Sequence, residues 1–292
     1  METTLNLSTV LYRRPATPAR KQGGLGTLFR PVDLIHGSCW RAILAFACPI
    51  ILSYLLQQIY TISDAAIVGQ TLTAQEVAGV NDTSALIFIF LQFAFGVSAG
   101  FCSVTSCRVG AHDDAGVRRS LAVQFLLSGI LTVLLTALAL ALLDPMLAWI
   151  NVTPESGEVY RAAHTYCAVI FAGIGAQLFY NFVCSFLRSM GDSATPLAFL
   201  LFSTVLNVGL DLLFILSFRW GVAGAAFATV TAQLISTVGC FLYAFRRYPQ
   251  LRLTKADWRF PRHEVTRHLI QGVPLGLQFS VLAVGIIVMQ SV

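Results

Sequence analysis

Seven long apolar runs, separated by short charged or turn-rich breaks, restrict the fold of this chain more than any other feature of its sequence. A helix needs about 20 apolar residues to cross the hydrocarbon core of a bilayer, and each run reaches that length. The runs are continuous and lack the alternation of a membrane-spanning strand, so they predict transmembrane helices and not a barrel. The expected spans are residues 42–68, 84–107, 120–143, 161–187, 196–218, 221–245 and 270–292.

The composition agrees with a membrane protein and excludes several other classes. Of the 292 residues, 56% are hydrophobic and 11% are charged, with a mean hydropathy of +0.73, whereas a soluble domain carries about 25% charged residues. The seven cysteines are scattered without a CxxC pair, and the sequence contains no Walker loop, zinc-protease motif or nucleophile elbow. We therefore expect a protein that is not an enzyme, uses no cofactor and binds no nucleic acid, despite its net charge of +5.

The distribution of basic residues predicts the orientation in the membrane. The chain holds 19 Lys and Arg residues, and only Arg161 and Arg219 lie beside the loops on one side of the predicted bundle. The others lie in the N-terminal segment or beside the loops on its side of the membrane. The positive-inside rule therefore predicts a multi-pass protein of the plasma membrane with a cytoplasmic N-terminus.

Two acidic side chains lie well inside the apolar runs, Asp64 in the first span and Asp211 in the fifth. A carboxylate at the centre of a bilayer costs about 2.5–3.5 kcal/mol, so each needs a partner or a function. Counted along the helices from their predicted outer ends, both acids and Thr229 of the sixth span lie at similar depth in the outer half of the membrane. The three side chains are therefore expected to lie together.

Polar neighbours share the helix faces of these acids. Gln57 and Tyr60 precede Asp64 at helical spacing, and Asn207 precedes Asp211 by one turn. Together these residues predict an oxygen-rich cluster that is chemically suited to bind a proton or a hard cation such as Na⁺. Amide and hydroxyl side chains also form hydrogen bonds between membrane helices, so a purely structural role for them is the alternative.

A weak internal repeat divides the chain. Pro274 in the last span and Pro49 in the first both follow a basic stretch, and a few neighbouring residues match at the same offset. A parallel repeat of six helices is one plan of secondary transporters, which place their site between the two halves. The predicted divisions are a cytoplasmic N-terminal segment (1–40), a first six-helix bundle (41–246), a basic cytoplasmic linker (247–269) and the first helix of a second bundle (270–292).

Several short motifs follow one another along the spans. They are Pro49 and Tyr60-x-x-x-Asp64 in the first span, LRSMGD at 187–192 with Pro196 before the fifth, Asn207-x-x-x-Asp211 within it, and GVAGAAFAT at 221–229 in the sixth. With these motifs the chain resembles the multidrug and toxic compound extrusion (MATE) transporters over about residues 41–292. The resemblance implies an all-α membrane fold of twelve helices in two six-helix bundles, here truncated to the first bundle and the first helix of the second.

The resemblance also implies a function. It implies a secondary active antiporter that exports amphipathic organic cations in exchange for Na⁺ or H⁺, and that needs the missing second bundle or a second copy to transport. Its coupling-ion site, which would also hold Na⁺, is then Asp64, Asn207, Asp211 and Thr229, with Gln57, Tyr60, Tyr166 and Asn181 as the surrounding residues.

Two other functions are left open by the sequence. One is a flippase of related architecture for lipid-linked saccharides, although such a protein is expected to line its cavity with basic residues, and no Lys or Arg lies at the middle of a predicted span. The other is a membrane fragment or assembly partner that does not transport. The sequence does not distinguish Na⁺ from H⁺, because carboxylate, amide and hydroxyl oxygens suit both.

Overall fold

The computed structural model describes residues 39–248, 253, 257–258 and 260–290, and the regular structure in this part of the chain is entirely helical. Six helices are long and apolar enough to cross a membrane, and the number rises to seven when the bent pair α5 and α6 counts as one span. The predicted all-α membrane fold is confirmed. The helices are α1 (Cys39–Thr71), α2 (Ala74–Gly110), α3 (Asp114–Ala141), α4 (Leu143–Trp149), η2 (Pro154–Ser156), α5 (Glu158–Ala172), α6 (Ile174–Ser189), α7 (Ala194–Asp211), the π-helical η3 (Leu212–Ser217), α8 (Gly221–Arg247) and α9 (Arg262–Gln290).

Some helix ends differ from the predicted ones. α2 begins well before the predicted span because Thr73 and Glu76 form a capping box: the Thr73 backbone N–H donates to Glu76 Oε2 at 2.9 Å, and the Glu76 N–H donates to Thr73 Oγ1 at 3.3 Å. The last helix begins at Arg262, inside the predicted linker. Nearly all of the predicted N-terminal segment, and part of the linker, lie outside the described residues.

The predicted span 161–187 is broken into α5 and α6, which meet at an angle of 45°. The break falls at Gly173, where an added Cβ would lie 2.3 Å from Cγ2 of Val230 on α8. At Gly175 an added Cβ would lie 2.6 Å from Cγ2 of Thr132 on α3. Two glycines with one residue between them therefore interrupt the helix and allow the bend to approach the neighbouring helices closely.

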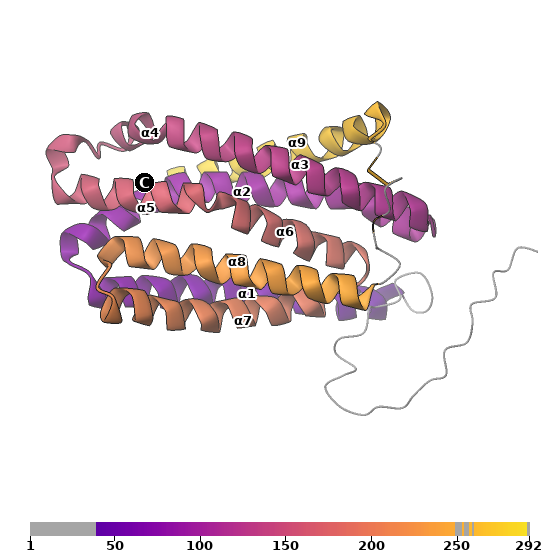
Figure 1. The fold of residues 1–292 in the computed structure, drawn as a ribbon, viewed down its shortest axis with the longest axis horizontal. Helices are drawn as coiled ribbons and strands as arrows, with labels where there is room; N and C mark the ends of the chain where they lie inside the picture. Colours follow the sequence, from indigo (N-terminus) through magenta and orange to yellow (C-terminus); the bar gives the residue numbers. More distant parts are fainter. Residues whose placement is uncertain (1–38, 249–252, 254–256, 259, 291–292) are drawn as a thin grey trace, which may run out of the picture.

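The helices run along the long axis of the molecule in two groups with a shared centre. In Figure 1, α2, α3 and α9 lie on one side and α1, α7 and α8 on the other, with α5 and α6 between them. α2 packs against α9, α6 and α5, whereas α8 joins α7 to α5 and α6. α1 packs mainly against α7, and its most apolar stretch is only 11% buried. Most of the surface of α1 is therefore left for lipid or for another protein segment.

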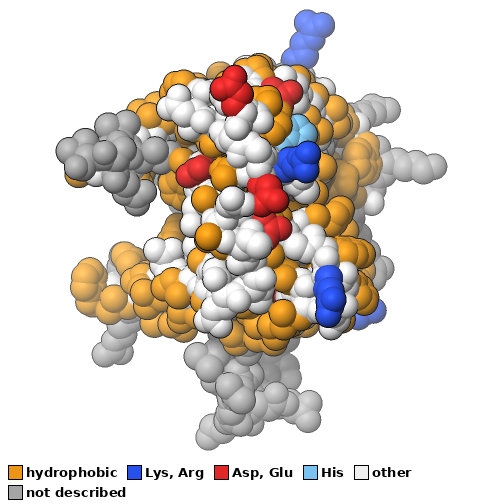
Figure 2. Space-filling model, turned by 90° about the vertical axis from the view of Figure 1, so that its left-hand side faces the viewer, with side chains coloured by type: hydrophobic (Ala, Val, Ile, Leu, Met, Phe, Trp, Pro, Cys, Tyr) orange, Lys and Arg blue, Asp and Glu red, His pale blue; other side chains and the backbone are white. Residues whose placement is uncertain are grey.

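The two ends of the bundle differ in charge. The end that carries the α2–α3 turn and the start of α9 is called the basic end here. The opposite end faces the viewer in Figure 2, where acidic side chains are spread over the surface with few basic ones among them. Among the described residues, its arginines are Arg161 and Arg219, whereas the basic end carries Arg108, Arg118, Arg119, Arg188, Arg246, Arg247, Arg262 and Arg267.

Glycines bring α2 and α9 into backbone contact. An added Cβ at Gly96 would lie 2.7 Å from the carbonyl oxygen of Leu275, and one at Gly100 would lie 2.5 Å from that of Gln271. On the facing helix, a Cβ at Gly272 would meet the ring of Phe101 at 2.3 Å. The pattern Gly-x-x-x-Gly on α2 thus allows the close helix packing that the sequence suggests.

We predict that Gly100→Ala destabilises the protein, because its new methyl group meets backbone and not a flexible side chain. The expected loss is about 1–3 kcal/mol, the usual cost of overpacking. Gly129→Ala on α3 is the matched control, since nothing lies within 4 Å of its added Cβ, and it should stabilise the helix by up to about 1 kcal/mol. Thermal unfolding of both variants in detergent tests this, and equal melting temperatures would contradict the close α2–α9 contact.

Candidate cation site

The two acids of the apolar spans lie next to each other in the structure. Asp64 projects from α1 and Asp211 from the last turn of α7, and their carboxyl groups interact directly. Asp211 is fully buried, with no exposed surface, and Asp64 is partly buried. The similar depth predicted for the two side chains therefore corresponds to a shared position between α1 and α7.

Hydroxyl groups from three helices surround the carboxylates. Tyr60, one turn before Asp64 on α1, has its hydroxyl beside that of Thr229 on α8 and interacts with both acids. Tyr166 of α5 is buried and also interacts with both acids and with Tyr60. The site is thus formed by α1, α5, α7 and α8.

The polar atoms of this cluster lack hydrogen-bond partners within the described part of the chain. Unpaired buried atoms are Oδ1 of Asp64, both carboxylate oxygens of Asp211, both amide atoms of Asn207, the hydroxyl of Tyr60 and Oγ1 of Thr229. A buried polar group without a partner costs about 1–3 kcal/mol, and an unpaired charge costs more. So many unpaired atoms in one place make the cluster a candidate site for a ligand that would supply the missing partners.

The donor set defines which ligands fit. The cluster offers carboxylate, hydroxyl and amide oxygens, and no group of three or more His, Cys, Asp or Glu side chains with metal-binding geometry occurs among the described residues. Oxygen-only sites suit hard cations, whereas zinc and copper sites use histidine or cysteine. Two adjacent carboxylates also disfavour a state in which both are charged, so a proton or a cation between them relieves their repulsion.

The remaining predicted site residues lie outside this contact group. Asn207 is fully buried one turn before Asp211 on the same face of α7. Gln57 on α1 and Asn181 on α6 are half-buried. Neither is among the groups that interact with the carboxyl groups of Asp64 and Asp211 in the described part of the chain. The structure therefore brings together Tyr60, Asp64, Tyr166, Asp211 and Thr229 directly, and places Asn207 beside them.

Further unpaired polar atoms, which were not predicted from the sequence, continue from the site toward the basic end. Contacts of Gly224 with Phe214 and of Gly239 with Phe199 fix the antiparallel register of α7 and α8. That register puts Asn207 within two residues of the position opposite Gln233, and Ser203 within one residue of the position opposite Ser236; all four are buried and have an unpaired polar atom. The signal was present in the helical spacing of Ser203, Asn207 and Asp211 on α7 and of Thr229, Gln233 and Ser236 on α8.

The backbone changes at the site. The α-helix α7 ends at Asp211, and the next six residues, η3 (Leu212–Ser217), form a π-helix. Single π-helical turns inside membrane or soluble helices often mark functional positions. The wider turn directly follows the buried carboxylate, so the local backbone helps to set its direction.

Another buried acid, Asp192, differs from Asp64 and Asp211. Asp192, before α7, has 1% of its surface exposed and accepts hydrogen bonds from the backbone N–H of Thr195 at 3.0 Å and from its hydroxyl at 2.7 Å. The hydroxyl of Tyr248 donates to the same carboxylate at 3.4 Å. Asp192 is therefore a satisfied structural acid that fixes the start of α7.

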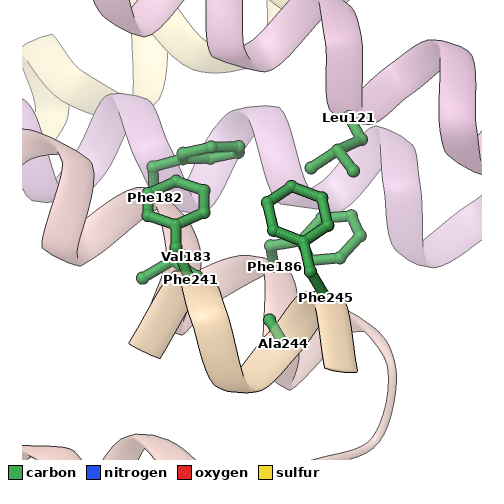
Figure 3. Close-up of a pocket in the computed structure, with 7 residues that line it drawn as sticks. All are labelled: Leu121, Phe182, Val183, Phe186, Phe241, Ala244 and Phe245. Atoms are coloured by element: carbon green, nitrogen blue, oxygen red, sulfur yellow. The ribbon is translucent and has the colours of Figure 1, made fainter. Parts of the chain in front are cut away.

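The apolar pocket in Figure 3 is separate from the site. It lies between α3, α6 and α8, and Figure 3 shows phenylalanine rings turned toward one another around it. Its lining contains no polar side chain: Leu121, Phe182, Val183, Phe186, Phe241, Ala244 and Phe245.

Unpaired acids in the interior of an all-helical membrane bundle are typical of ion-coupled transporters. Comparison with known proteins gives the family. The MatE family model matches residues 49–213, and the chain belongs to this family of MATE multidrug efflux transporters, as the sequence motifs predicted. It represents the N-terminal portion of the family fold.

The relatives support this assignment at the level of sequence and fold. The probable multidrug resistance protein YpnP of Bacillus subtilis is 31% identical over 89% of this chain and 57% of its own length. A solved MATE transporter in its outward-facing conformation has a TM-score of 0.81 at 25% identity, over 90% of this chain and 57% of that one. A solved inward-facing MATE transporter gives a TM-score of 0.71 at 25% identity, over 80% of this chain and 54% of that one. The chain thus spans little more than half the length of these relatives.

We predict opposite effects on stability for the two kinds of buried acid. Asp192→Asn should lower the melting temperature, because it removes an acceptor of charge-assisted hydrogen bonds that contribute about 1.5–3 kcal/mol each. Asp211→Asn should leave it unchanged or raise it, since it removes one of two adjacent buried carboxylates that repel each other when both are charged. Thermal unfolding of the detergent-solubilised protein distinguishes the two. A large loss of stability in Asp211→Asn would instead assign Asp211 a structural role.

Proposed function

We propose that this protein is a secondary active antiporter that exports amphipathic organic cations in exchange for Na⁺ or H⁺. The observation that carries the proposal is the cluster of unpaired buried oxygens around Asp64 and Asp211. Membership of the MATE family and the multidrug resistance names of its relatives support the substrate class.

The coupling ion has a defined effect at the site. A proton or Na⁺ that enters between Asp64 and Asp211 neutralises buried charge and gives partners to Tyr60, Asn207 and Thr229. Because α1 packs mainly against α7, the state of the Asp64–Asp211 pair changes how tightly the two helices associate. α1 also contains Pro49, which removes one backbone hydrogen bond and makes bending easier there. Ion binding is thereby linked to movement of the first helix.

Transport by this mechanism needs a second bundle. The first bundle supplies the ion site, and the substrate cavity lies between two bundles that alternate in their access to the two sides. A second bundle, or a second copy of this chain, is the partner that completes it. The positive-inside rule predicts that the basic end and the N-terminus face the cytoplasm, and the proposed ion site would then lie in the outer half of the membrane.

We predict that Asp211→Asn abolishes ion-dependent efflux of a fluorescent organic cation in a full-length protein with both bundles. The amide keeps the size of the side chain but cannot exchange a proton or neutralise a cation. Efflux should fall to the level of cells without the protein, while membrane insertion is unchanged. Asp82→Asn is the matched control, since Asp82 is exposed on α2, and it should transport normally. Normal efflux by Asp211→Asn would remove this residue from the mechanism.

The identity of the coupling ion follows from a second measurement. In proteoliposomes that contain the full-length protein, an imposed proton gradient without Na⁺ should drive substrate uptake if the coupling ion is H⁺. An imposed Na⁺ gradient at equal pH should drive it if the ion is Na⁺. In either case, Asp64→Asn should abolish the substrate uptake that is driven by that ion gradient. Uptake driven by neither gradient would support the alternative of a membrane protein that does not transport.

A further inference from the structure

A buried ion pair joins α2 to α9 at the basic end of the bundle. Arg108, in the last turn of α2, pairs through Nη2 with Oε2 of Glu264, in the first turn of α9. The two residues have only 8% and 4% of their surface exposed. Nη1 of Arg108 also donates to the carbonyl oxygen of Gly116 at 2.7 Å, which ties the pair to the start of α3. Charge-assisted contacts of this kind are among the stronger hydrogen bonds in proteins.

A chain of hydrogen bonds extends the ion pair into the bundle. Nδ1 of His268 lies 2.8 Å from the carbonyl oxygen of Glu264, so it donates, and Nε2 accepts from the hydroxyl of Ser120 at 2.7 Å. Ser120 then accepts from Thr105 at 2.8 Å, and the amide of Gln124 donates to the Thr105 hydroxyl. All four of these residues are fully buried. This chain of hydrogen bonds connects α9 to α3 and α2 without a gap.

The same two helices meet along their glycines about two turns deeper than the ion pair. Gly100 and Gly272 approach so closely that an added Cβ on Gly100 would lie 2.5 Å from Cα of Gly272. Figure 1 shows α9 beginning beside the ends of α2 and α3 at the basic end. Movement of α9 away from α2 therefore breaks the ion pair, the hydrogen-bond chain and the glycine contact together.

The solved relatives provide a reason to link this contact to one conformation. The chain matches the outward-facing MATE structure with a TM-score of 0.81 over 90% of its length, and the inward-facing one with 0.71 over 80%. The chain as a whole is therefore more similar to the outward-facing structure, and we infer that the contact between α9 and α2 belongs to that state.

We propose that the buried pair Arg108–Glu264, with the chain through His268, Ser120, Thr105 and Gln124, is a latch that holds the basic end closed in the outward-facing state. The latch opens when α9 leaves α2 and α3. The role of the latch in transport rests on the proposed antiport. Its first test does not, because that test measures a distance between two helices and not transport.

The surroundings of Glu264 make the latch reversible. Nη1 of Arg119 lies 3.8 Å from Oε1 of Glu264, and Nε2 of His263 lies 3.5 Å from the same atom. Their side chains are 41% and 75% exposed, so they lie at the water-accessible rim. When the pair with Arg108 breaks, the Glu264 carboxylate therefore still has basic groups and water nearby, and opening does not leave it stranded in an apolar region.

The first test compares Glu264→Gln with Asp114→Asn in the full-length protein. Glu264→Gln removes the charge of the latch and keeps its size, whereas Asp114 is an exposed acid at the start of α3. Spin labels on cysteines at Ala111 and Thr266, both exposed, report the distance between α2 and α9 after native cysteines are replaced by alanine. We expect Glu264→Gln to lower the ratio of short to long distances about tenfold, equivalent to about 1.4 kcal/mol. The same distribution in both variants would overturn the latch.

A second test keeps the proposal falsifiable if Glu264→Gln folds poorly. Cysteines at Ala111 and Thr266, both exposed and outside the ion pair, are joined by a reducible bifunctional reagent in the full-length protein, which ties the end of α2 to α9 and leaves Arg108 and Glu264 in place. Transport should stop when the link forms and return when it is reduced, while the uncrosslinked variant transports. Transport at the same rate with the link intact would show that α2 and α9 need not separate. Loss of transport before crosslinking would concern the proposed function, and the distance measurement would then decide on the latch alone.

Discussion

The cost of holding a charge away from water determines how the buried polar groups of this bundle are arranged. A carboxylate at the centre of a membrane costs about 2.5–3.5 kcal/mol, and the chain contains three arrangements that meet this cost differently. Asp192 receives hydrogen bonds from Thr195 and Tyr248. Glu264 is paired with Arg108 across two helices. Asp211 and Asp64 have neither, and lie against each other with unpaired oxygens. The first acid has a purely structural setting, the second joins two segments, and the third arrangement is the one that we propose binds the coupling ion.

The three arrangements lie on helices that are held to different extents. Asp192 and Glu264 are near the basic end, where α2, α3, α6 and α9 pack closely. Asp64 lies on α1, whose contacts are mainly with α7. A ligand that neutralises the Asp64–Asp211 pair therefore acts on the helix with the least support from the rest of the bundle. A small change in free energy at that place produces a larger movement than the same change would produce on α2, which is packed on several sides.

Composition and hydropathy predicted the membrane fold because apolar runs of sufficient length have few alternatives in lipid. That Asp64, Asp211 and Thr229 lie close together could also be predicted, since the rise of a helix converts sequence position into distance along it. The break at Gly173 could not be predicted, because it depends on Val230 of another helix.

Gln233 and Ser236 were not predicted as site residues because uncharged polar residues are common in membrane helices, and only the register of α7 against α8 makes them neighbours of Asn207 and Ser203. Glu264 and His268 were missed for a similar reason: they lie in a stretch predicted as linker, and their partners are more than a hundred residues away in sequence.

The energies of the proposed ion site and of the proposed latch are compatible with alternation between two states. A ligand must favour one state by about 5.5 kcal/mol to move an equilibrium from 1:99 to 99:1. One elementary charge that crosses the full membrane potential contributes about 2.3 kcal/mol per 100 mV, so a latch that is much stronger than the sum of such contributions would not open. The Arg108–Glu264 pair is buried, but the exposed side chains of Arg119 and His263 lie beside the Glu264 carboxylate. These neighbours lower the cost of opening, because a pair without them would leave each separated charge buried and unpaired. The exposed basic neighbours of Glu264, and not the ion pair alone, are what make the proposed latch suitable for a transporter that must open and close in every cycle.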